Sequence, residues 1–297
     1  MPMVIDYEQE ITDLSQTLGL KLAADWQAGP AHFVEALAYY LEYQFSLADG
    51  GLSLVTLGRG TAFLERVEAY LRQLKVEPAA LETFISMRRY AGEATWGIKL
   101  PLSGEPEIQL YVKKPLPLTE VLFWLGRQGV SVEAAERLTT IADQLHKAHT
   151  HFLGVDFTPG RAVPFQIYFT QYLDEETPVA GRLDQISEVL GLPDTARSRL
   201  AQYHPLLAQP QETMWLSFSL VEGELLPTLK LDYSGIRLGL AAMLLEDMVA
   251  PETAFNYLKI ISETLGIERA NYMGLRLKGE APPTLSFYFT RLSRTLP

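Results

Sequence analysis

Four basic residues lie in strand-like segments of the sequence where their side chains would share one face. They are Lys99, Lys113, Lys230 and Arg276. Successive side chains of a strand point to opposite faces, and each of these residues is in phase with the polar positions of its segment. Several cations on one face repel one another unless an anion lies among them. A diphosphate is a suitable anion, because its oxygens accept charge-assisted hydrogen bonds from arginine and lysine.

Three tyrosines, Tyr111, Tyr168 and Tyr288, fall on the same predicted face at matching places in their segments. Their rings would face a positive charge and exclude water, and their hydroxyls would bond phosphate oxygens. With the cations they indicate a site for an allylic diphosphate, whose ionisation leaves a carbocation. The alternative is a wide polar interior in which the lysines are solvated, and the residues alone do not separate these two interpretations.

These side chains belong to a hairpin that the sequence repeats. The clearest copy pairs 152–158 with 165–170 through a turn at Pro159-Gly160. Its apolar residues alternate with polar ones, so one face of the hairpin is apolar and the other is polar. The period is roughly 60 residues. Each copy has a glycine at its turn, because glycine adopts a positive φ with little steric cost. The other copies are 41–47 with 52–57, 95–100 with 108–113, 215–220 with 228–232, and 272–278 with 285–290.

Helical segments separate the hairpins. Ser131 is an expected N-cap, and Pro251 is expected to open the last helix. The predicted helices cover 7–18, a stretch from Pro30, 61–74, 82–89, 118–128, 132–149, 181–190, 194–203, 236–248 and 252–265.

The apolar faces of the helices and of the hairpins must both be buried, and an isolated hairpin is only marginally stable. Closing about ten antiparallel strands into a barrel removes exposed edges. We therefore predict an α+β fold, a ten-stranded antiparallel β-barrel with a solvated lumen ringed by α-helices, formed by one domain over 1–297.

Composition narrows the function classes. The net charge of −11 argues against a general nucleic-acid binder. The sequence has no cysteine, which excludes disulfides and zinc–thiolate sites and fits a reducing, cytoplasmic compartment. The N-terminal residues lack a signal pattern, and the longest apolar run, 238–245, is too short to span a bilayer. We expect a monomer that acts away from membranes.

The order and spacing of the hairpins resemble the ABBA, or PT-barrel, aromatic prenyltransferases, and most closely the cyanobactin peptide prenyltransferases. The residues that carry this resemblance are 40–47, then 97–100 with 109–113, then 152–157 with 166–168. The resemblance covers nearly the whole chain as a pattern, although each motif is short. It implies repeated αββα units around a ten-stranded barrel. It also implies transfer of a dimethylallyl or geranyl group from its diphosphate to a nucleophilic peptide side chain.

The resemblance also assigns roles. It implies that Glu42 accepts the proton from the acceptor, whereas the alternative is a solvated glutamate at the end of the preceding helix. Gln166 is a further candidate for the diphosphate site. The sequence departs from the family pattern at two places. The third hairpin offers Gln166 and Tyr168 but no lysine or arginine in mid-strand, and Asp232 is an acid on the inward face where a cation or an aromatic residue is expected. Trp215 and Tyr272 are candidates for the acceptor surface, although a large aromatic residue at a strand start is more often packing.

Asp156 and Asp232 are candidate Mg²⁺ ligands, because carboxylate oxygens suit this ion. They form ion pairs with Lys99 or Lys230 in the alternative interpretation. The sequence has no Asp-rich DDxxD motif, which favours ionisation assisted by cationic side chains over a strictly metal-driven one. Mg²⁺ is thus the candidate cofactor, and we expect no organic cofactor.

Two other functions stay open at this point. In the first, the protein is a prenyltransferase whose acceptor is a free indole or phenol. In the second, the protein is a non-catalytic barrel that binds an anionic lipid-like ligand. His146, His149 and His151 do not indicate zinc, because they lack HExxH spacing and are predicted at the end of a helix.

Overall fold

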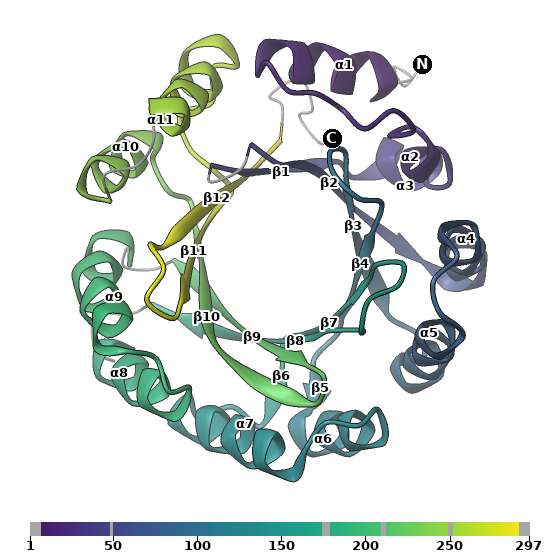
Figure 1. The fold of residues 1–297 in the computed structure, drawn as a ribbon, viewed down its shortest axis with the longest axis vertical. Helices are drawn as coiled ribbons and strands as arrows, with labels where there is room; N and C mark the ends of the chain where they lie inside the picture. The colour runs from purple at the N-terminus through teal and green to yellow at the C-terminus, as the bar shows by residue number, and fades with distance from the viewer. Residues whose placement is uncertain (1–6, 48–49, 174–178, 209–211, 249–251, 291–297) are drawn as a thin grey trace.

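The described residues contain a closed antiparallel barrel of ten strands, with helices around its outside (Figure 1). The computed structural model describes residues 7–47, 50–173, 179–208, 212–248 and 252–290. The strand order around the barrel is β1-β12-β11-β10-β9-β8-β7-β4-β3-β2. Each barrel strand therefore pairs with the barrel strands before and after it in the chain, and β1 pairs with β12 to close the barrel. Both the predicted barrel and its coat of helices are confirmed.

Every predicted hairpin is present in the barrel. The turn of the fourth copy lies at Glu222 and Gly223, whose φ angles of 51° and 85° are left-handed. The strand that follows is longer than predicted, because a bulge between Leu225 and Leu229 lets pairing continue toward the turn. Asp49, in the first predicted turn, lies outside the described residues. The barrel strands are β1 (Glu42–Ser46), β2 (Leu52–Arg59), β3 (Thr95–Pro101), β4 (Ile108–Lys113), β7 (Phe152–Phe157), β8 (Phe165–Tyr172), β9 (Thr213–Val221), β10 (Glu224–Ser234), β11 (Tyr272–Lys278) and β12 (Thr284–Phe289).

The helices follow the predicted segments closely. The Oγ of Ser131 caps its helix by accepting a hydrogen bond from the Ala134 amide at 3.1 Å, whereas Pro251 lies outside the described residues. The stretch from Pro30 forms two short helices. The bounds are α1 (Tyr7–Thr17), α2 (Ala28–Ala31), α3 (Val34–Tyr39), α4 (Gly60–Leu74), α5 (Pro78–Ala91), α6 (Leu118–Arg127), α7 (Val132–Gln144), α8 (Val179–Val189), α9 (Asp194–Leu207), α10 (Leu238–Asp247), α11 (Glu252–Lys259) and the π-helical η1 (Ile260–Thr264).

One helix is shorter than predicted. α7 ends at Gln144, and His146 adopts a left-handed φ of 54° that stops the helix. The chain then forms β6 (His149–Thr150), which pairs with β5 (Leu116–Pro117) in a two-stranded sheet that the sequence analysis missed. The prediction that His149 and His151 lie at a helix end was therefore wrong.

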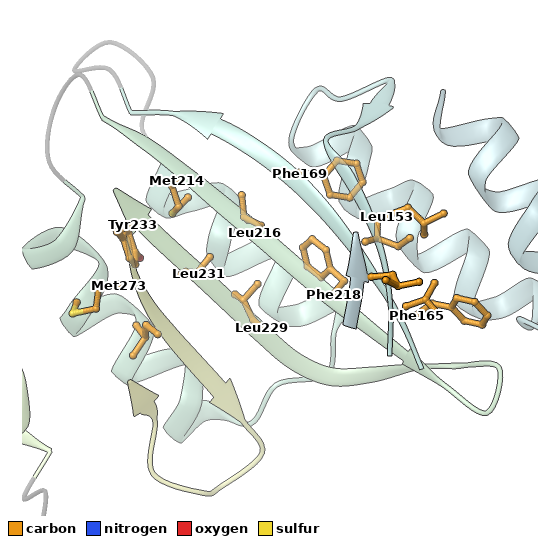
Figure 2. Packing of buried hydrophobic residues seen from close by; sticks show 14 of the residues in the cluster. Leu153, Phe165, Phe169, Met214, Leu216, Phe218, Leu229, Leu231, Tyr233 and Met273 are labelled. Carbon is orange, nitrogen blue, oxygen red and sulfur yellow. The ribbon is translucent and has the colours of Figure 1, made fainter. Parts of the chain in front are cut away.

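The hydrophobic core lies between the barrel and the helices, not inside the barrel. Figure 2 shows outward-facing residues of β7 to β11, such as Leu153, Phe169, Phe218 and Leu231, packed together beneath the helical layer. These four side chains are fully buried. Period-two alternation in each strand therefore turns the opposite, polar residues into the lumen. The hydrophobic effect on the outer face fixes which residues line the inner one.

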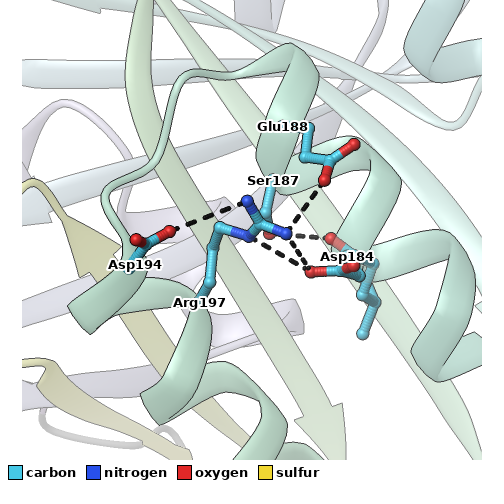
Figure 3. A network of polar contacts seen from close by, with 6 residues as sticks. Asp184, Ser187, Glu188, Asp194 and Arg197 are labelled. Atoms are coloured by element: carbon cyan, nitrogen blue, oxygen red, sulfur yellow. Dashed lines mark hydrogen bonds and ion pairs between the residues drawn. The ribbon is translucent and has the colours of Figure 1, made fainter.

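Polar contacts tie neighbouring helices of the coat. Arg197 of α9 contacts Asp184 and Glu188 of α8 at 2.9 Å each (Figure 3). Such exposed pairs add little stability. Over the described ranges, no helix is long and apolar enough to cross a membrane.

Candidate active site in the barrel lumen

A cavity of about 130 Å³ lies inside the barrel. Most of the side chains predicted from the sequence reach it, from eight of the strands. It is lined by Glu42, Val55, Leu57, Gly97, Lys99, Tyr111, Lys113, Phe152, Tyr168, Trp215, Lys230, Asp232, Tyr272 and Tyr288. Asp156, Gln166 and Arg276 do not line this cavity. They lie nearer the hairpin turns, where Arg276 is opposite Lys230 in the register and is exposed.

The two ends of the lumen differ in character. Glu42, Phe152 and Tyr272 begin their strands and Lys113 ends its own, so all four lie where the chain connects to the helices. Trp215 lies near this end too, and its ring packs against Tyr272 at 4.6 Å between centroids. The end that connects to the helices is therefore aromatic, whereas the turn end carries more hydrogen-bonding groups.

Lys230 and Asp232 form a buried ion pair in the lumen. The Lys230 Nζ lies 2.7 Å from one carboxylate oxygen of Asp232 and 2.8 Å from the other. It also donates to the Tyr288 hydroxyl at 3.0 Å. This is the ion-pair alternative left open for Asp232, and it means that the Lys230 charge is already balanced.

Two other lysines of the cavity have no ion-pair partner in the described part of the chain. Lys99 is half-buried, and burial lowers its pKa to about 8 although the Asp156 carboxylate opposes the shift. Burial also lowers the pKa of Lys113, with Glu42 opposing. The Lys113 Nζ lies 5.0 Å from the centre of the Phe152 ring. An anion bound in the cavity would favour the charged form of both lysines.

Two of the three tyrosines, Tyr111 and Tyr168, are held by glutamines two residues earlier on the same strands. The Tyr111 hydroxyl donates to Gln109 Oε1 at 2.6 Å, and the Tyr168 hydroxyl donates to Gln166 Oε1. The two rings meet edge to face at 5.8 Å. Burial raises the pKa of the Tyr111, Tyr168 and Tyr288 hydroxyls, so these phenols stay neutral and present aromatic rings and oxygen lone pairs to the lumen.

Glycines beside Tyr111 make room for its ring. Gly97 and Gly154 face it from β3 and β7, directly across in the register. A Cβ atom at Gly154 would lie 3.2 Å from the Tyr111 Cδ1 and 3.2 Å from the Gln166 Cβ. The position of the Tyr111 ring thus depends on glycine, which has no side chain, at the neighbouring position.

Glu42 lies on β1 and is 4% exposed, so the alternative of a solvated glutamate at a helix end is wrong. Burial raises the pKa of its carboxyl, whereas hydrogen bonds from Asn271 and Tyr40 and the charge of Lys113 oppose that shift. The Asn271 Nδ2 donates to Glu42 Oε1 at 2.8 Å. A buried carboxylate of raised pKa suits a general base near neutral pH.

Asp156 is tied to the tyrosine network at the turn end. Gln166 Nε2 donates to its Oδ2 at 2.8 Å, and burial raises its pKa to about 7, with Lys99 opposing. Its Oδ1 is buried without a hydrogen-bond partner in the described residues, as is the Trp215 Nε1 donor.

The described residues contain no group of three or more His, Asp or Glu that fits a metal ion. Asp156 and Asp232 lie on separate strands, and Asp232 is engaged by Lys230. These two carboxylates do not form a Mg²⁺ cage by themselves, because Mg²⁺ needs near-octahedral oxygen ligands. Their metal role stays a prediction.

The sequence analysis missed several residues around this site. Phe152 is in phase with Gly154 and Asp156, so strand alternation would have placed it in the lumen. Gln109 likewise shares a face with Tyr111. Asn271 lies just outside β11 and is distant from Glu42 in the sequence, so the fold is needed to bring the two together. Tyr40 has extended backbone two residues before Glu42, and strand alternation carried one step further would have placed it on the same face.

No family model matches the chain, and no curated protein matches it either. Solved structures do resemble it. The 5-dimethylallyltryptophan synthase from Streptomyces coelicolor aligns with a TM-score of 0.65 at 15% identity, over 96% of each chain. The chain has the PT-barrel fold.

Two further prenyltransferase structures share this fold. PriB, in a ternary complex with L-tryptophan and dimethylallyl thiolodiphosphate, has a TM-score of 0.66 at 15% identity, over 94% of this chain and 93% of that one. NotF prenyltransferase has a TM-score of 0.65 at 12% identity, over 89% and 87%. Identities this low establish the shared PT barrel and leave the finer resemblance to cyanobactin enzymes a prediction.

Proposed function

We propose that this chain is an aromatic prenyltransferase that moves a short isoprenyl group, dimethylallyl or geranyl, from its diphosphate to an electron-rich acceptor. The observation that carries the proposal is the shared cavity in which two unpaired lysines, a ring of tyrosines and a buried carboxylate meet. Each group suits one stage of the reaction. The PT-barrel neighbours that bind a dimethylallyl diphosphate analogue and tryptophan support the same chemistry.

The diphosphate lies against the cationic side chains. Lys99 and Lys113 have no ion-pair partner in the described chain, and Lys230 becomes available if its ion pair with Asp232 opens. Arg276 and Gln166 lie toward the turns. Their positive charge stabilises the leaving group as the C1–oxygen bond of the donor breaks and the electron pair departs with the diphosphate. Because these cations serve the leaving group, we expect turnover to persist in EDTA, with Mg²⁺ assisting at most through the diphosphate oxygens and Asp156 or Asp232.

The allylic cation left behind is enclosed by Tyr111, Tyr168 and Tyr288. Their neutral rings stabilise positive charge and shield it from water that would quench it. An aromatic carbon or heteroatom of the acceptor then attacks the cation and forms the new bond. The proton that the acceptor loses passes to the Glu42 carboxylate, so charge and atoms balance.

The acceptor enters from the aromatic end. Trp215 and Tyr272 line the cavity there, and the Trp215 Nε1, which has no hydrogen-bond partner among the described residues, offers a donor to an oxygen of the ligand. An indole or phenol ring fits this lining by stacking. The resemblance to cyanobactin enzymes supports the finer proposal that this ring belongs to a peptide side chain, whereas the tryptophan bound by the PT-barrel neighbours supports a free amino acid.

Turnover tests the proposal. The purified chain is incubated with dimethylallyl or geranyl diphosphate and with free tryptophan, free tyrosine and peptides containing these residues. We expect diphosphate release coupled to a mass gain of one isoprenyl group on the acceptor. Saturable donor binding with no product from any acceptor would instead favour a barrel that binds an anionic lipid-like ligand. Product from peptides but not from free amino acids would select the peptide acceptor.

A further inference from the structure

Two residues outside the barrel strands hold the Glu42 carboxylate. Asn271 precedes β11, and its Nδ2 donates to Glu42 Oε1 at 2.8 Å. Tyr40 lies between α3 and β1, and its hydroxyl beside the carboxylate lowers the pKa of Glu42 against the effect of burial. The two residues are 231 positions apart in the sequence.

Both holding residues are themselves fixed by their backbones. The Asn271 amide donates to the Tyr288 carbonyl at 2.7 Å, and the Asn271 carbonyl accepts from the Gly235 amide at 2.9 Å. The Tyr40 amide donates to the Ala36 carbonyl at 2.9 Å, and the Tyr40 carbonyl accepts from the Thr56 hydroxyl. An asparagine side chain is short, so a fixed backbone leaves its amide little freedom. The carboxylate is therefore held from two rigid points.

We infer that Asn271 and Tyr40 are positioning residues that keep Glu42 oriented and ionised for proton transfer. The inference rests on the proposed function. Donation from an amide and a phenol stabilises the carboxylate form, which is the form that accepts a proton. Without them, burial and the nearby Asp232 would favour the protonated carboxyl, which is useless as a base.

The charged and titratable groups that face Glu42 influence the pKa that a titration of its carboxyl would measure. Lys113 of β4 favours its ionised form, and Asp232 of β10 opposes it. Tyr272 of β11 and Tyr288 of β12 also face it, but burial keeps these phenols neutral. The two donors and Lys113 therefore counter the desolvation of the carboxylate, and removing a donor shifts the balance toward the protonated form.

The substitution Asn271→Asp tests this inference, because it preserves the size of the side chain while replacing a donor with a second carboxyl. Two carboxyls at this distance share a proton. We expect the acid limb of the kcat/KM profile to move up by about one pH unit or more, and kcat at neutral pH to fall at least about tenfold. Affinity for dimethylallyl thiolodiphosphate should change less than about twofold. The chain's other asparagine, Asn256, is exposed on α11, and Asn256→Asp is the matched control.

A second variant and a second readout keep the test independent of folding and of turnover. Tyr40→Phe removes the other donor and should move the acid limb in the same direction by a smaller amount. An NMR titration of the Glu42 carboxyl should show its pKa raised in both variants, even if no acceptor is known. An unmoved titration in Asn271→Asp overturns the inference. Absence of turnover in the wild type would instead count against the proposed function.

Discussion

Lys230 and Asp232 lie two residues apart on β10 and face the lumen together, with the Lys230 Nζ 2.7 Å from the Asp232 carboxylate. Both side chains are buried, at 6% and 7% exposure. The barrel thus holds a cation whose charge is cancelled before any ligand enters. A diphosphate that uses Lys230 must compete with Asp232 for it.

Asp232→Asn should tighten binding of inorganic pyrophosphate. The amide still accepts a hydrogen bond from Lys230 but no longer repels the anion, so we expect about a tenfold lower Kd by calorimetry, equivalent to about 1.4 kcal/mol. Asp143→Asn, on the exposed face of α7, is the control and should leave the Kd unchanged. Weaker binding in Asp232→Asn would mean that Asp232 helps to place the ligand rather than opposing it.

Glu42→Gln should separate chemistry from donor binding. The amide fills the same space next to Asn271 but cannot accept a proton, so kcat should fall at least about a hundredfold while the Kd for dimethylallyl thiolodiphosphate stays within about twofold. In the wild type, the raised pKa of Glu42 predicts a rate that falls as the pH drops through that pKa. A fully active Glu42→Gln enzyme would show that another group, or water, takes the proton.

The fold and much of the lumen could be predicted from the sequence because strand alternation has only two phases. Once Phe169 and Phe218 face the helices, Tyr168 and Ser217 must face inward, and the register of β8 and β9 sets them side by side. The same logic placed Lys99, Lys113 and Tyr288. It works because burial of the outer face leaves no other register.

What the sequence did not reveal depends on pairings between distant segments. The ion pair between Lys230 and Asp232 depends on the side-chain rotamers of both residues, which the sequence does not specify. The hydrogen bond from Asn271 to Glu42 joins a loop to the first strand. The early end of α7 depends on a left-handed His146, which is rare for a residue with a Cβ and carries no local signal. Arg276 has the predicted phase, but its place near the turns leaves it exposed.

Gly154→Ala should displace Tyr111 and slow turnover. The added methyl would lie 3.2 Å from both the Tyr111 ring and the Gln166 Cβ, tighter than most packed contacts, so the ring must shift into the cavity. We expect kcat/KM to fall several-fold while the protein stays folded by circular dichroism. Gly126→Ala on α6 is the control, because its Cβ would meet nothing within 4 Å and alanine favours a helix. Equal activity in Gly154→Ala would mean that the Tyr111 position does not limit the reaction.

His204 should make the fold sensitive to acid. Its Nδ1 lies 2.8 Å from the Tyr233 hydroxyl beneath α9, and burial lowers its pKa to about 4 from an ordinary 6.5. Between these values the unfolded chain binds a proton that the folded chain does not, so stability falls as the pH drops from 6.5 toward 4. The loss approaches roughly 3 kcal/mol. His204→Gln keeps a hydrogen-bonding side chain without a titrating group, and urea unfolding should then depend less on pH across this window. His149→Gln, at an exposed site on β6, should retain the wild-type slope, and an equal slope in His204→Gln would locate the acid sensitivity elsewhere.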